Sequence, residues 1–431
     1  MEDNMNHFRH DRQQFFKQIE GFWHDLFGIE YALWDVKIEP LTNVKRIRQA
    51  TEIIGHILLK TAPLLRQLDD ETLLQLGFPS GSLTFIRLQT IPSFESVIAR
   101  LDLVVTKEDV KLLEVNSDTP TFIKEAFSVN GAVCKEFGWN NPNEGCEQKL
   151  RKAVQEAVHT AADSLEKRKK PNIVFTSHTE HDEDRLTTLY LQELYGLDSQ
   201  YLSLDRLQLV SEPIIENGEV IFEQGLYDTN GKKIDVLYRQ TYPIEHLIDD
   251  EDPVTKEKVG QLLMKFVEEK ELAILNPPSA FLLQSKAVMA LIWGLHETQH
   301  SFYTKEEHDW ISTYFLPTYL DADFFQKQGI SYVKKPSFGR EGDSIEIYQA
   351  SGKKIDEDRH KTYEHSLPVF QQFIKLPQMV VQTEQGKKTV HYMYGCFYVN
   401  GQASAIGIRA GRQITDNESY FLPVGLKKEE E

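Results

Sequence analysis

Cysteine is scarce in this sequence, and long apolar runs are missing. The 431 residues include three cysteines, Cys134, Cys146 and Cys396, without a Cys-x-x-Cys spacing. An odd, widely spaced set is not typical of a disulfide framework, so we expect reduced structural thiols. There is no run of about eighteen apolar residues, and the start, Met-Glu-Asp-Asn, lacks the basic and then apolar order of a signal peptide. We therefore expect a cytoplasmic protein that does not bind membranes.

The signature motifs of several large protein classes are also absent. The sequence has no Walker A ending in Gly-Lys-Ser/Thr, no Gly-x-Gly-x-x-Gly fingerprint, no His-Glu-x-x-His zinc motif and no Gly-x-Ser-x-Gly elbow. Among the fourteen histidines, only His178 and His181 are suggestively spaced, which is more typical of loop histidines than of a ligand pair. P-loop, Rossmann, metalloprotease and α/β-hydrolase functions are therefore not indicated.

Positive charge is in deficit. The sequence has 48 Lys and Arg residues and 66 Asp and Glu residues, which gives a formal net charge of −18. Nucleic-acid binding depends on clustered basic side chains, so we expect no nucleic-acid partner. Solubility explains such acidity, and a cationic small-molecule partner such as a polyamine remains open as a second explanation.

The apolar periodicity indicates mixed α/β subdomains. Helical spacing dominates before residue 80, where it predicts one helical face of Phe15, Ile19, Phe22 and Trp23. A charged helix is expected at about 147–168. Short buried strands around 173–175, 236–238 and 274–275 alternate with helical patterns, while 378–424 is almost entirely strand-like.

A chain of this length is expected to form two or three packed units. We expect an N-terminal helical region with a hairpin, a middle α/β subdomain, and a last region that ends in antiparallel sheet; their ranges are 1–168, 169–270 and 271–431.

The segment from Arg100 to Asn116 has the pattern of a β-hairpin around a polar turn. If the turn centres on residue 108, opposed residues have numbers that sum to 216, which places Asp102 opposite Glu114 and Arg100 opposite Asn116. Alternation puts these four side chains on one side. The other side is expected to carry an apolar strip of Leu101, Leu103, Val105, Leu113 and Val115.

Oxygen donors on the polar side of this hairpin suit Mg²⁺, which combines one or two carboxylates with phosphate oxygens and water. Arg100 beside them suits an anion. An ordinary strand face with cross-strand ion pairs is the alternative for any such hairpin.

Lys286 is the first of two lysines in surroundings that suit phosphate. Pro277-Pro278-Ser279 predicts a helix start, with Ser279 as cap, and the helix is expected to continue through Lys286 to Trp293. A buried ammonium needs an anionic partner, although a lysine that reaches out to water is the alternative.

A glycine-containing loop carries the second lysine. A strand at 330–333 leads into residues 334–344, after which strand alternation resumes. Gly339 and Gly342 permit close backbone approach, so the loop amides and Lys335 can hold phosphates. An ordinary hairpin loop is the alternative.

Together, Arg-Leu-Asp and Glu-Val-Asn of the hairpin, Gln-Ser-Lys-Ala at 284–287, Val-Lys-Lys-Pro-Ser-Phe-Gly-Arg-Glu-Gly at 333–342 and the late sheet resemble the glutathionylspermidine synthase family. The resemblance spans about 20–425. It implies an α/β (α+β) ATP-grasp fold, with mixed and antiparallel sheets flanked by helices and a permuted motif order in which the metal hairpin precedes the lysines and the glycine loop. It also implies the synthetase domain alone, without the amidase domain that bifunctional members carry.

The resemblance assigns roles to residues. Two Mg²⁺ ions are expected at Asp102, Glu114 and Asn116. Arg100 is expected at the transferred phosphate, and Arg409 is expected to steady the tetrahedral intermediate, with a surface arginine as the alternative. The implied ATP-binding positions are Arg100, Asp102, Lys286, Lys335, Glu341, Gly342, Gln371, Gln372, Phe373 and Ile374.

The implied substrate-binding positions match the family less closely. They are Thr119, Thr121, Glu183, Asp184 and Thr241. Thr119 and Thr121 stand where the family has serines, and Glu183 and Asp184 stand where it has a Glu-Glu pair, one member binding glutathione and the other the polyamine. A helix N-terminus enriched in carboxylates is the alternative for this acidic pair. The family's late polyamine-binding aspartate and adenine-binding glutamine have no assigned counterpart.

Residues and resemblance together predict a carboxylate–amine ligase that uses ATP to form an acyl phosphate and then an amide. The expected small-molecule partners are a carboxylate, such as a glutathione-like peptide, and an amine, such as a polyamine. A nucleotide-binding protein of the same fold without turnover, acting as a sensor or scaffold, is the alternative, and a phosphotransferase is the third hypothesis. The oligomeric state is not predicted.

Overall fold

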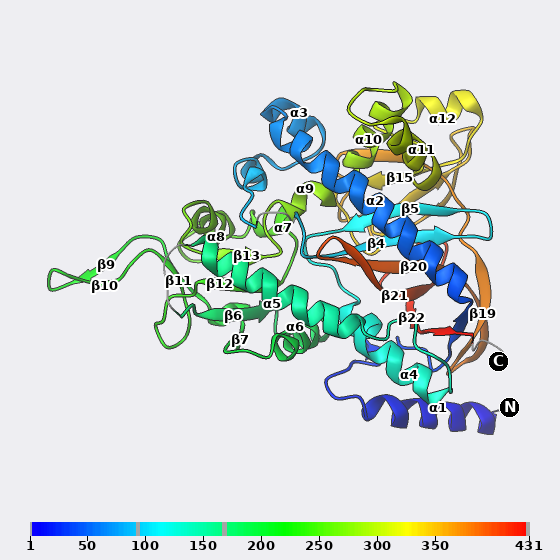
Figure 1. Cartoon of the computed structure of the whole chain (residues 1–431), viewed down its shortest axis with the longest axis horizontal. Helices are drawn as coiled ribbons and strands as arrows, with labels where there is room; N and C mark the ends of the chain where they lie inside the picture. The colour runs from blue at the N-terminus through cyan, green and yellow to red at the C-terminus, as the bar shows by residue number, and fades with distance from the viewer. Residues whose placement is uncertain (1, 92–94, 166–169, 428–431) are drawn as a thin grey trace.

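The computed structural model of the protein describes residues 2–91, 95–165 and 170–427. Figure 1 shows several sheets with helices laid over their faces. The α-helices are α1 (Glu2–Lys17), α2 (Leu41–Gln67), α3 (Asp70–Gln75), α4 (Asn130–Glu136), α5 (Cys146–Ser164), α6 (Asp182–Tyr195), α7 (Ile244–Leu247), α8 (Val259–Glu268), α9 (Ala280–Gln284), α10 (Ala287–Glu297), α11 (Lys305–Tyr314) and α12 (Asp323–Gln328).

The largest sheet is antiparallel and has six strands in the order β22-β21-β20-β4-β5, with β19 paired to β20. It joins a hairpin from the first third of the chain to strands from its end. Its strands are β4 (Ile98–Val105), β5 (Val110–Asn116), β19 (Gln378–Thr383), β20 (Gly386–Val399), β21 (Gln402–Gly411) and β22 (Tyr420–Leu422).

Helix α2 crosses one face of this sheet (Figure 1). Its buried side chains recur at helical spacing, as at Val44, Ile47, Ile54 and Leu58, so one stripe of the helix faces the core. Gly55 lies on that stripe, and a Cβ there would meet the ring of Tyr398 at 2.4 Å. The close packing of helix and sheet therefore requires glycine at this position.

A second sheet is parallel, in the order β13-β12-β6-β7. Its short apolar strands are buried, as expected for strands covered by helices, and α5 and α6 pack on it and on each other. The strands are β6 (Ile173–Ser177), β7 (Gln200–Ser203), β12 (Val236–Gln240) and β13 (Ala273–Leu275).

A third sheet is antiparallel, in the order β14-β18-β15-β16-β17, and helix α10 contacts its edge strand. Strand β15 carries Lys335 into the glycine loop, and β18 carries the first residues of the expected hinge. The strands are β14 (Thr318–Tyr319), β15 (Tyr332–Pro336), β16 (Glu346–Tyr348), β17 (Lys354–Glu357) and β18 (Pro368–Gln372).

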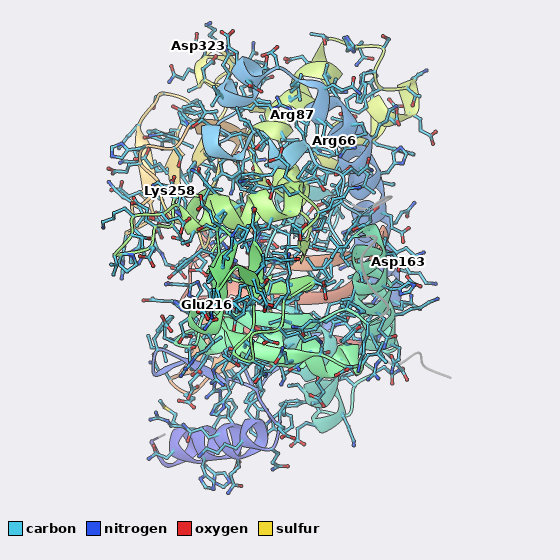
Figure 2. The ribbon with its side chains drawn as sticks, turned by 90° about the vertical axis from the view of Figure 1, so that its left-hand side faces the viewer. Arg66, Arg87, Asp163, Glu216, Lys258 and Asp323 are labelled. Carbon is cyan, nitrogen blue, oxygen red and sulfur yellow. The ribbon has the colours of Figure 1, made fainter. Side chains whose placement is uncertain are left out.

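Smaller pairs complete the fold. They are β1 (Asp25–Leu26) with β2 (Ile29–Glu30), β3 (Lys37–Glu39) with β23 (Val424–Leu426), β8 (Gln208–Val210) with β11 (Gly225–Tyr227), and β9 (Ile214–Glu216) with β10 (Glu219–Phe222). The β9–β10 hairpin projects at the left of Figure 1, so in Figure 2 it points toward the viewer, where Glu216 at its tip is labelled.

The predicted fold class is confirmed in its main features. The expected strands at 173–175, 236–238 and 274–275 and the late antiparallel sheet are present, and the metal hairpin precedes both lysines. One helical expectation was wrong, because α1 ends at Lys17 and Phe22 and Trp23 pack from the loop that follows.

The division into three units stays a prediction. Its boundary near 168 lies outside the described residues, and β13, just beyond the boundary at 270, pairs with β12 of the middle part. No helix in the part of the chain that the structure describes is long and apolar enough to cross a membrane.

Candidate active site

The β4–β5 hairpin brings together the four polar residues that its register predicts. Arg100 lies opposite Asn116, and Asp102 lies opposite Glu114, so the pairing deduced from the sum of residue numbers is confirmed. Strand β20 pairs with the other edge of β4 and places Gly395 beside Asp102, where a Cβ would come within 3.0 Å of Arg100. The neighbouring strand therefore leaves room for the Arg100 side chain.

The register shifts by one residue immediately beyond Asp102, where Leu103 pairs with Leu112. This bulge leaves Leu113 without a cross-strand partner and turns it away from the main core. The prediction that Leu113 belongs to the apolar strip was therefore wrong: Leu112 takes that place, and Leu113 lines the cleft described below. Bulges of this kind re-aim side chains near functional sites.

The side chain of Asn276, which follows β13, fixes both ends of the hairpin. The amide of Asn276 accepts hydrogen bonds from the backbone of Val97 (2.9 Å) and Ile98 (3.2 Å) and donates to carbonyls of Ile98, Ser117 and Asp118. Buried amides satisfied in this way hold backbone segments in register. The hairpin and the segment after it are therefore one rigid platform.

Arg100 and Asp102 form a buried bidentate pair. Nε lies 2.7 Å from Oδ1 and Nη2 lies 3.0 Å from Oδ2, while Asn116 Nδ2 lies 3.4 Å from Oδ2. Burial raises the pKa of Asp102, and the guanidinium of Arg100 opposes this rise. Two parallel hydrogen bonds fix the orientation of both side chains.

Two lysines converge on Glu114. Lys286 Nζ lies 3.2 Å from Glu114 Oε2 and donates to the carbonyl of Gly339 at 2.8 Å, whereas Lys335 Nζ donates to Gln371 Oε1 at 2.8 Å. Burial opposes ionisation of Glu114, but the charges of Lys286, Lys335 and Arg100 lower its pKa to about 2. Burial lowers the pKa of Lys335 to about 8, against the attraction of Glu114.

Lys286 occupies a break between two helices. The continuous helix predicted through this residue was wrong, because α9 ends at Gln284 and α10 begins at Ala287. The backbone N–H of Lys286 donates to the carbonyl of Ser337 (2.8 Å) in the glycine loop, and Ser285 is extended. Ser279 precedes α9 but makes no side-chain capping bond. Lys286 is thus buried by contact with the glycine loop.

A cleft collects most of the expected ATP-binding residues. Glu114, Lys335 and Arg409 are the charged residues of its lining, and apolar side chains form much of the remaining wall. The site residues predicted from the sequence that line it are Glu114, Lys335, Gly342, Gln371, Gln372, Phe373, Ile374 and Arg409. Its apolar lining residues include Val333, Ile345, Ile347, Leu376, Met393 and Ile414. An apolar cleft with a few polar groups at one end suits a nucleotide base and its phosphates.

The glycine loop covers this cleft closely. Gly342 has φ of 75°, and a Cβ there would meet the carbonyl oxygen of Thr415 at 2.5 Å. Glu341, at φ of 55°, lines the neighbouring cavity instead. Positive φ and close backbone contact together require glycine at 342.

Arg409 connects the cleft to a second cavity of about 330 Å³. Its Nη2 donates to the carbonyl of Asp416 at 2.9 Å, and the residue lines both spaces. The cavity also contains predicted substrate positions, and its lining includes Tyr31, Thr121, Glu183, Asp184, Arg340 and Glu341. A third cavity of about 670 Å³ shares Tyr242, Arg340, Glu341 and Asn417 with the second.

Thr119 and Thr241 lie buried next to this second cavity. The Thr119 hydroxyl has no hydrogen-bond partner among the described residues, while its carbonyl accepts from Arg340 Nη2 at 3.0 Å. The Thr241 hydroxyl accepts from Arg239 Nη1 at 3.2 Å and precedes Tyr242 in the chain. In their present rotamers both threonines support the walls of the site.

The two predicted acidic residues differ in their surroundings. Burial, with the charges of Glu125, Asp184 and Glu341, raises the pKa of Glu183 to about 8. Burial also raises the pKa of Asp184, although the Arg340 charge opposes it. Both lie in the first turn of α6, so the helix-start interpretation and the cavity interpretation hold together.

Sequence reasoning missed Tyr31, Glu125 and Arg340. Arg340 stands between two residues of the glycine loop, so its place at the site could have been found from that pattern. Glu125 follows an apolar stretch and looks like an ordinary helical residue, and Tyr31 is far from any motif. Their contact depends on tertiary structure.

The donor set fits Mg²⁺ in its chemistry. Glu114 is ionised, Asp102 and Asn116 add oxygen atoms on the same strand face, and all three lie beside a phosphate-sized cluster of cations. Among the described residues, the hairpin included, no group of three or more His, Cys, Asp and Glu side chains is placed to hold a metal ion, so Asn116 would have to complete the set with the carboxylates of Asp102 and Glu114. Asp102 and Glu114 pair with Arg100 and Lys286, cations that phosphates would also attract.

The mixed α/β fold, with helices over several sheets, is that of a glutathione synthetase-like protein. The structure is similar to a glutathione synthetase-like effector, GSS30, from Globodera pallida, with a TM-score of 0.55, 12% sequence identity, and coverage of 92% of this chain and 90% of that chain. At this identity the likeness concerns the fold alone.

Sequence comparison then gives the family. The profile described as "Glutathionylspermidine synthase preATP-grasp" matches residues 4–427. A Haemophilus influenzae protein named "Putative acid--amine ligase" is 24% identical over 332 residues, which cover 75% of this chain and 73% of that protein. The chain belongs to the glutathionylspermidine synthase family, and the resemblance deduced from its motifs is confirmed.

Proposed function

We propose that this protein is an ATP-dependent ligase that joins a carboxylate to an amine through an acyl phosphate. One observation carries the proposal: Arg409 lines both the cleft that contains Lys335 and the hinge residues and the cavity that contains Glu183 and Asp184. A phosphate donor in the first space and an amine in the second would meet at this arginine. Membership of the family and the name of the Haemophilus influenzae relative support the ligase class.

The first step is phosphoryl transfer. A carboxylate oxygen of the substrate attacks the γ-phosphorus of ATP, and the bond to the ADP oxygen breaks. Lys335 lines the cleft, and the buried side chains of Lys286 and Arg100 act with it on Glu114, so the three supply fixed positive charge where electrostatic interactions are stronger than in water. The Arg100 guanidinium is held in place by its two bonds to Asp102, so little reorganisation is needed.

The second step is capture of the acyl phosphate by an amine. The nitrogen lone pair attacks the carbonyl carbon, and phosphate leaves with the electron pair of the C–O bond. Arg409 stabilises the oxyanion of the tetrahedral intermediate, since it faces both spaces. Asp184, on the cavity wall, attracts the ammonium form of the amine.

Asp102, Glu114 and Asn116 are the residues that would hold Mg²⁺, as two ions. Bound there, the metal would neutralise charge on the phosphate oxygens. The substrates that best suit the acidic and arginine-lined cavity are a glutathione-like peptide as the carboxylate and a polyamine as the amine. The threonines at 119 and 121 and the aspartate at 184 are the positions where this specificity is most open to change.

Hydroxylamine tests the proposal without knowledge of the amine, because it captures acyl phosphates as hydroxamates. The protein is incubated with ATP, Mg²⁺, hydroxylamine and single peptide carboxylates, beginning with glutathione. We expect ADP and hydroxamate in equal amounts with at least one carboxylate. ADP release that does not depend on any carboxylate, with no hydroxamate, would indicate a nucleotide-binding ATPase and refute the ligase.

A further inference from the structure

Tyr31 and Glu125 form a buried pair behind the second cavity, and the proposed function uses neither. The Tyr31 hydroxyl donates to Glu125 Oε1 at 2.6 Å, and Tyr31 itself lines the cavity. Glu125 has no exposed surface, and its Oε2 has no hydrogen-bond partner among the described residues. A buried carboxyl oxygen without a partner is costly, so it calls for a functional explanation.

Glu125 is also the first residue of a single π-helical turn, Glu125–Val129. Such turns are rare and often occur at functional sites, because they displace a side chain from ordinary helical geometry. Here the first residue of the turn places its carboxyl group against Tyr31 of the cavity wall, while Ala126, Phe127 and Val129 of the same turn pack in the core.

Glu183 is the carboxyl group of the cavity wall on which the charge of Glu125 acts. It projects from the start of α6, and no ion pair of Glu183 occurs within the part of the chain that the structure describes. The charged groups that act on it are Glu125 from the π-helical turn, Asp184 from its own helix, Glu341 from the glycine loop, Arg409 from β21, Arg100 from β4 and Tyr31. Near it on the cavity wall lie Asp25, Glu180, His181, Asp182 and Arg340.

We propose that Glu183 accepts the proton that the ammonium group of the amine substrate loses before attack, and that Glu125, held by Tyr31, is the positioning residue that maintains Glu183 as this proton acceptor. The inference rests on the proposed ligase function. It adds a role in catalysis to one member of the acidic pair that is predicted to bind substrate.

The step balances as follows. One ammonium N–H bond breaks and its proton passes to a carboxylate oxygen of Glu183, which leaves a free amine lone pair on nitrogen. The lone pair forms the C–N bond, and the C–O bond to phosphate breaks with its electrons on phosphate. A second proton leaves the nitrogen with the phosphate, which departs as hydrogen phosphate, and Glu183 returns its proton to water.

The electrostatics suit this role. A general base works best when its pKa lies near the pH at which the enzyme operates. Burial and the neighbouring carboxylates, Glu125 first among them, raise the pKa of Glu183 to about 8. Burial also raises the pKa of Glu125, and the charge of each carboxyl group opposes ionisation of the other, as in carboxyl pairs of catalytic sites.

Asp184 is the weaker candidate for proton acceptance. Burial raises its pKa too, but the Arg340 charge and a hydrogen bond from Gln240 oppose this rise. These contacts stabilise its ionised form and make it a fixed counter-charge for an ammonium. Glu183 therefore suits the role of a base, whereas Asp184 suits the role of a residue that binds the ammonium.

Two nucleophiles distinguish proton acceptance from binding. Glutathione is the carboxylate probe, spermidine is the amine probe, and hydroxylamine is the comparison because its amino group is largely unprotonated at neutral pH. We expect Glu183→Gln to lower kcat with spermidine by about 100-fold or more, and kcat with hydroxylamine by less than about fivefold. Raising the pH, which deprotonates spermidine, should restore part of the lost turnover. The matched control is Glu193→Gln, an exposed change on the same helix.

Glu125→Gln tests the positioning residue. It keeps the shape and a hydrogen-bond acceptor for Tyr31 but removes the negative charge, so the pKa of Glu183 should fall. The acidic limb of the kcat/KM profile with spermidine should then move to lower pH by about half a unit or more. Tyr31→Phe should move the same limb, whereas a purely structural role would change the melting temperature and leave the limb in place.

The outcomes separate this inference from the proposed function. If the wild-type protein forms hydroxamate but Glu183→Gln lowers kcat equally with spermidine and with hydroxylamine, the proton-acceptor role is overturned and the ligase function is left intact. An unchanged acidic limb in folded Glu125→Gln would show that Glu125 is not the positioning residue of Glu183. Failure of the wild-type protein to form any hydroxamate would overturn both.

Discussion

The Lys286 ammonium lies 3.2 Å from Oε2 of Glu114, which joins the break between α9 and α10 to strand β5. Lys286 is a predicted contact of the ATP phosphates, and Glu114 is a predicted ligand of the metal that these phosphates would share. In the protein alone each neutralises the other, which avoids an uncompensated buried charge. On the proposed function, binding of Mg²⁺ and ATP would exchange this ion pair for one between Lys286 and phosphate and one between Glu114 and the metal.

Replacement of Glu114 tests the metal assignment. We expect Glu114→Gln to lower Mg-dependent ADP release by about 100-fold, the scale of losing one electrostatic group at a reaction centre. The fold should persist, because glutamine keeps the shape of the side chain. Glu108→Gln in the exposed hairpin turn is the control and should turn over as the wild-type protein does. Normal turnover in folded Glu114→Gln would rule out a metal ligand at this position.

Lys335 should make ATP affinity dependent on pH. Its pKa of about 8 means that it is charged below pH 8 and progressively neutral above. Because the charged form binds phosphate, ATP affinity should fall as the pH rises through 8, and calorimetric titration measures this directly. In Lys335→Met the affinity should be weaker by about 10- to 100-fold and the slope should vanish. Lys334→Met, which removes a lysine paired with Glu346, is the control; an unaltered slope in Lys335→Met would contradict the assignment.

Gly342→Ala should damage the nucleotide cleft. The added Cβ would meet the Thr415 carbonyl oxygen at 2.5 Å, and φ of 75° is unfavourable for alanine, so the loop must move. We expect ATP affinity to drop by about tenfold, consistent with about 1–3 kcal/mol of strain. Gly329→Ala has a similar φ of 69° but open space around the Cβ, and should bind ATP normally. Equal affinities in both variants would show that the loop does not need this close contact.

The buried pair of Asp118 and Arg239 should be essential for stability. Arg239 Nη2 donates to Asp118 Oδ1, and both side chains have almost no exposed surface. Asp118→Asn leaves the guanidinium uncompensated and should lower the free energy of unfolding by about 3–5 kcal/mol. Adding Arg239→Met should recover much of this loss, as measured by urea unfolding. A double variant that is less stable than the single one would contradict the charge explanation.

The hairpin shows how much of the site could be predicted from sequence. Period-two alternation and a turn centred on residue 108 determined which residues face each other, because a strand register has few solutions once one face is apolar. The same reasoning failed at Leu113, since the bulge after Asp102 depends on packing that alternation does not encode.

The other errors have similar causes. Helical periodicity runs through Lys286, but the helix breaks there because the Lys286 N–H bonds to Ser337 in a loop from a distant part of the sequence. Glu125 and Tyr31 escaped notice because their role depends on a contact between residues far apart in the chain. Local patterns predict elements well, whereas breaks, bulges and buried polar pairs depend on tertiary structure.

The route of one oxygen atom tests the ligase account most directly. A carboxylate labelled with oxygen-18, for which glutathione is the first choice, is incubated with ATP, Mg²⁺ and spermidine, and the released phosphate is analysed by mass spectrometry. Acyl phosphate formation places a carboxylate oxygen between carbon and phosphorus, so each amide formed should release phosphate that carries one labelled oxygen. Phosphate that contains only unlabelled oxygen, in the presence of full turnover, would contradict the acyl phosphate mechanism and with it the ligase function proposed for this site.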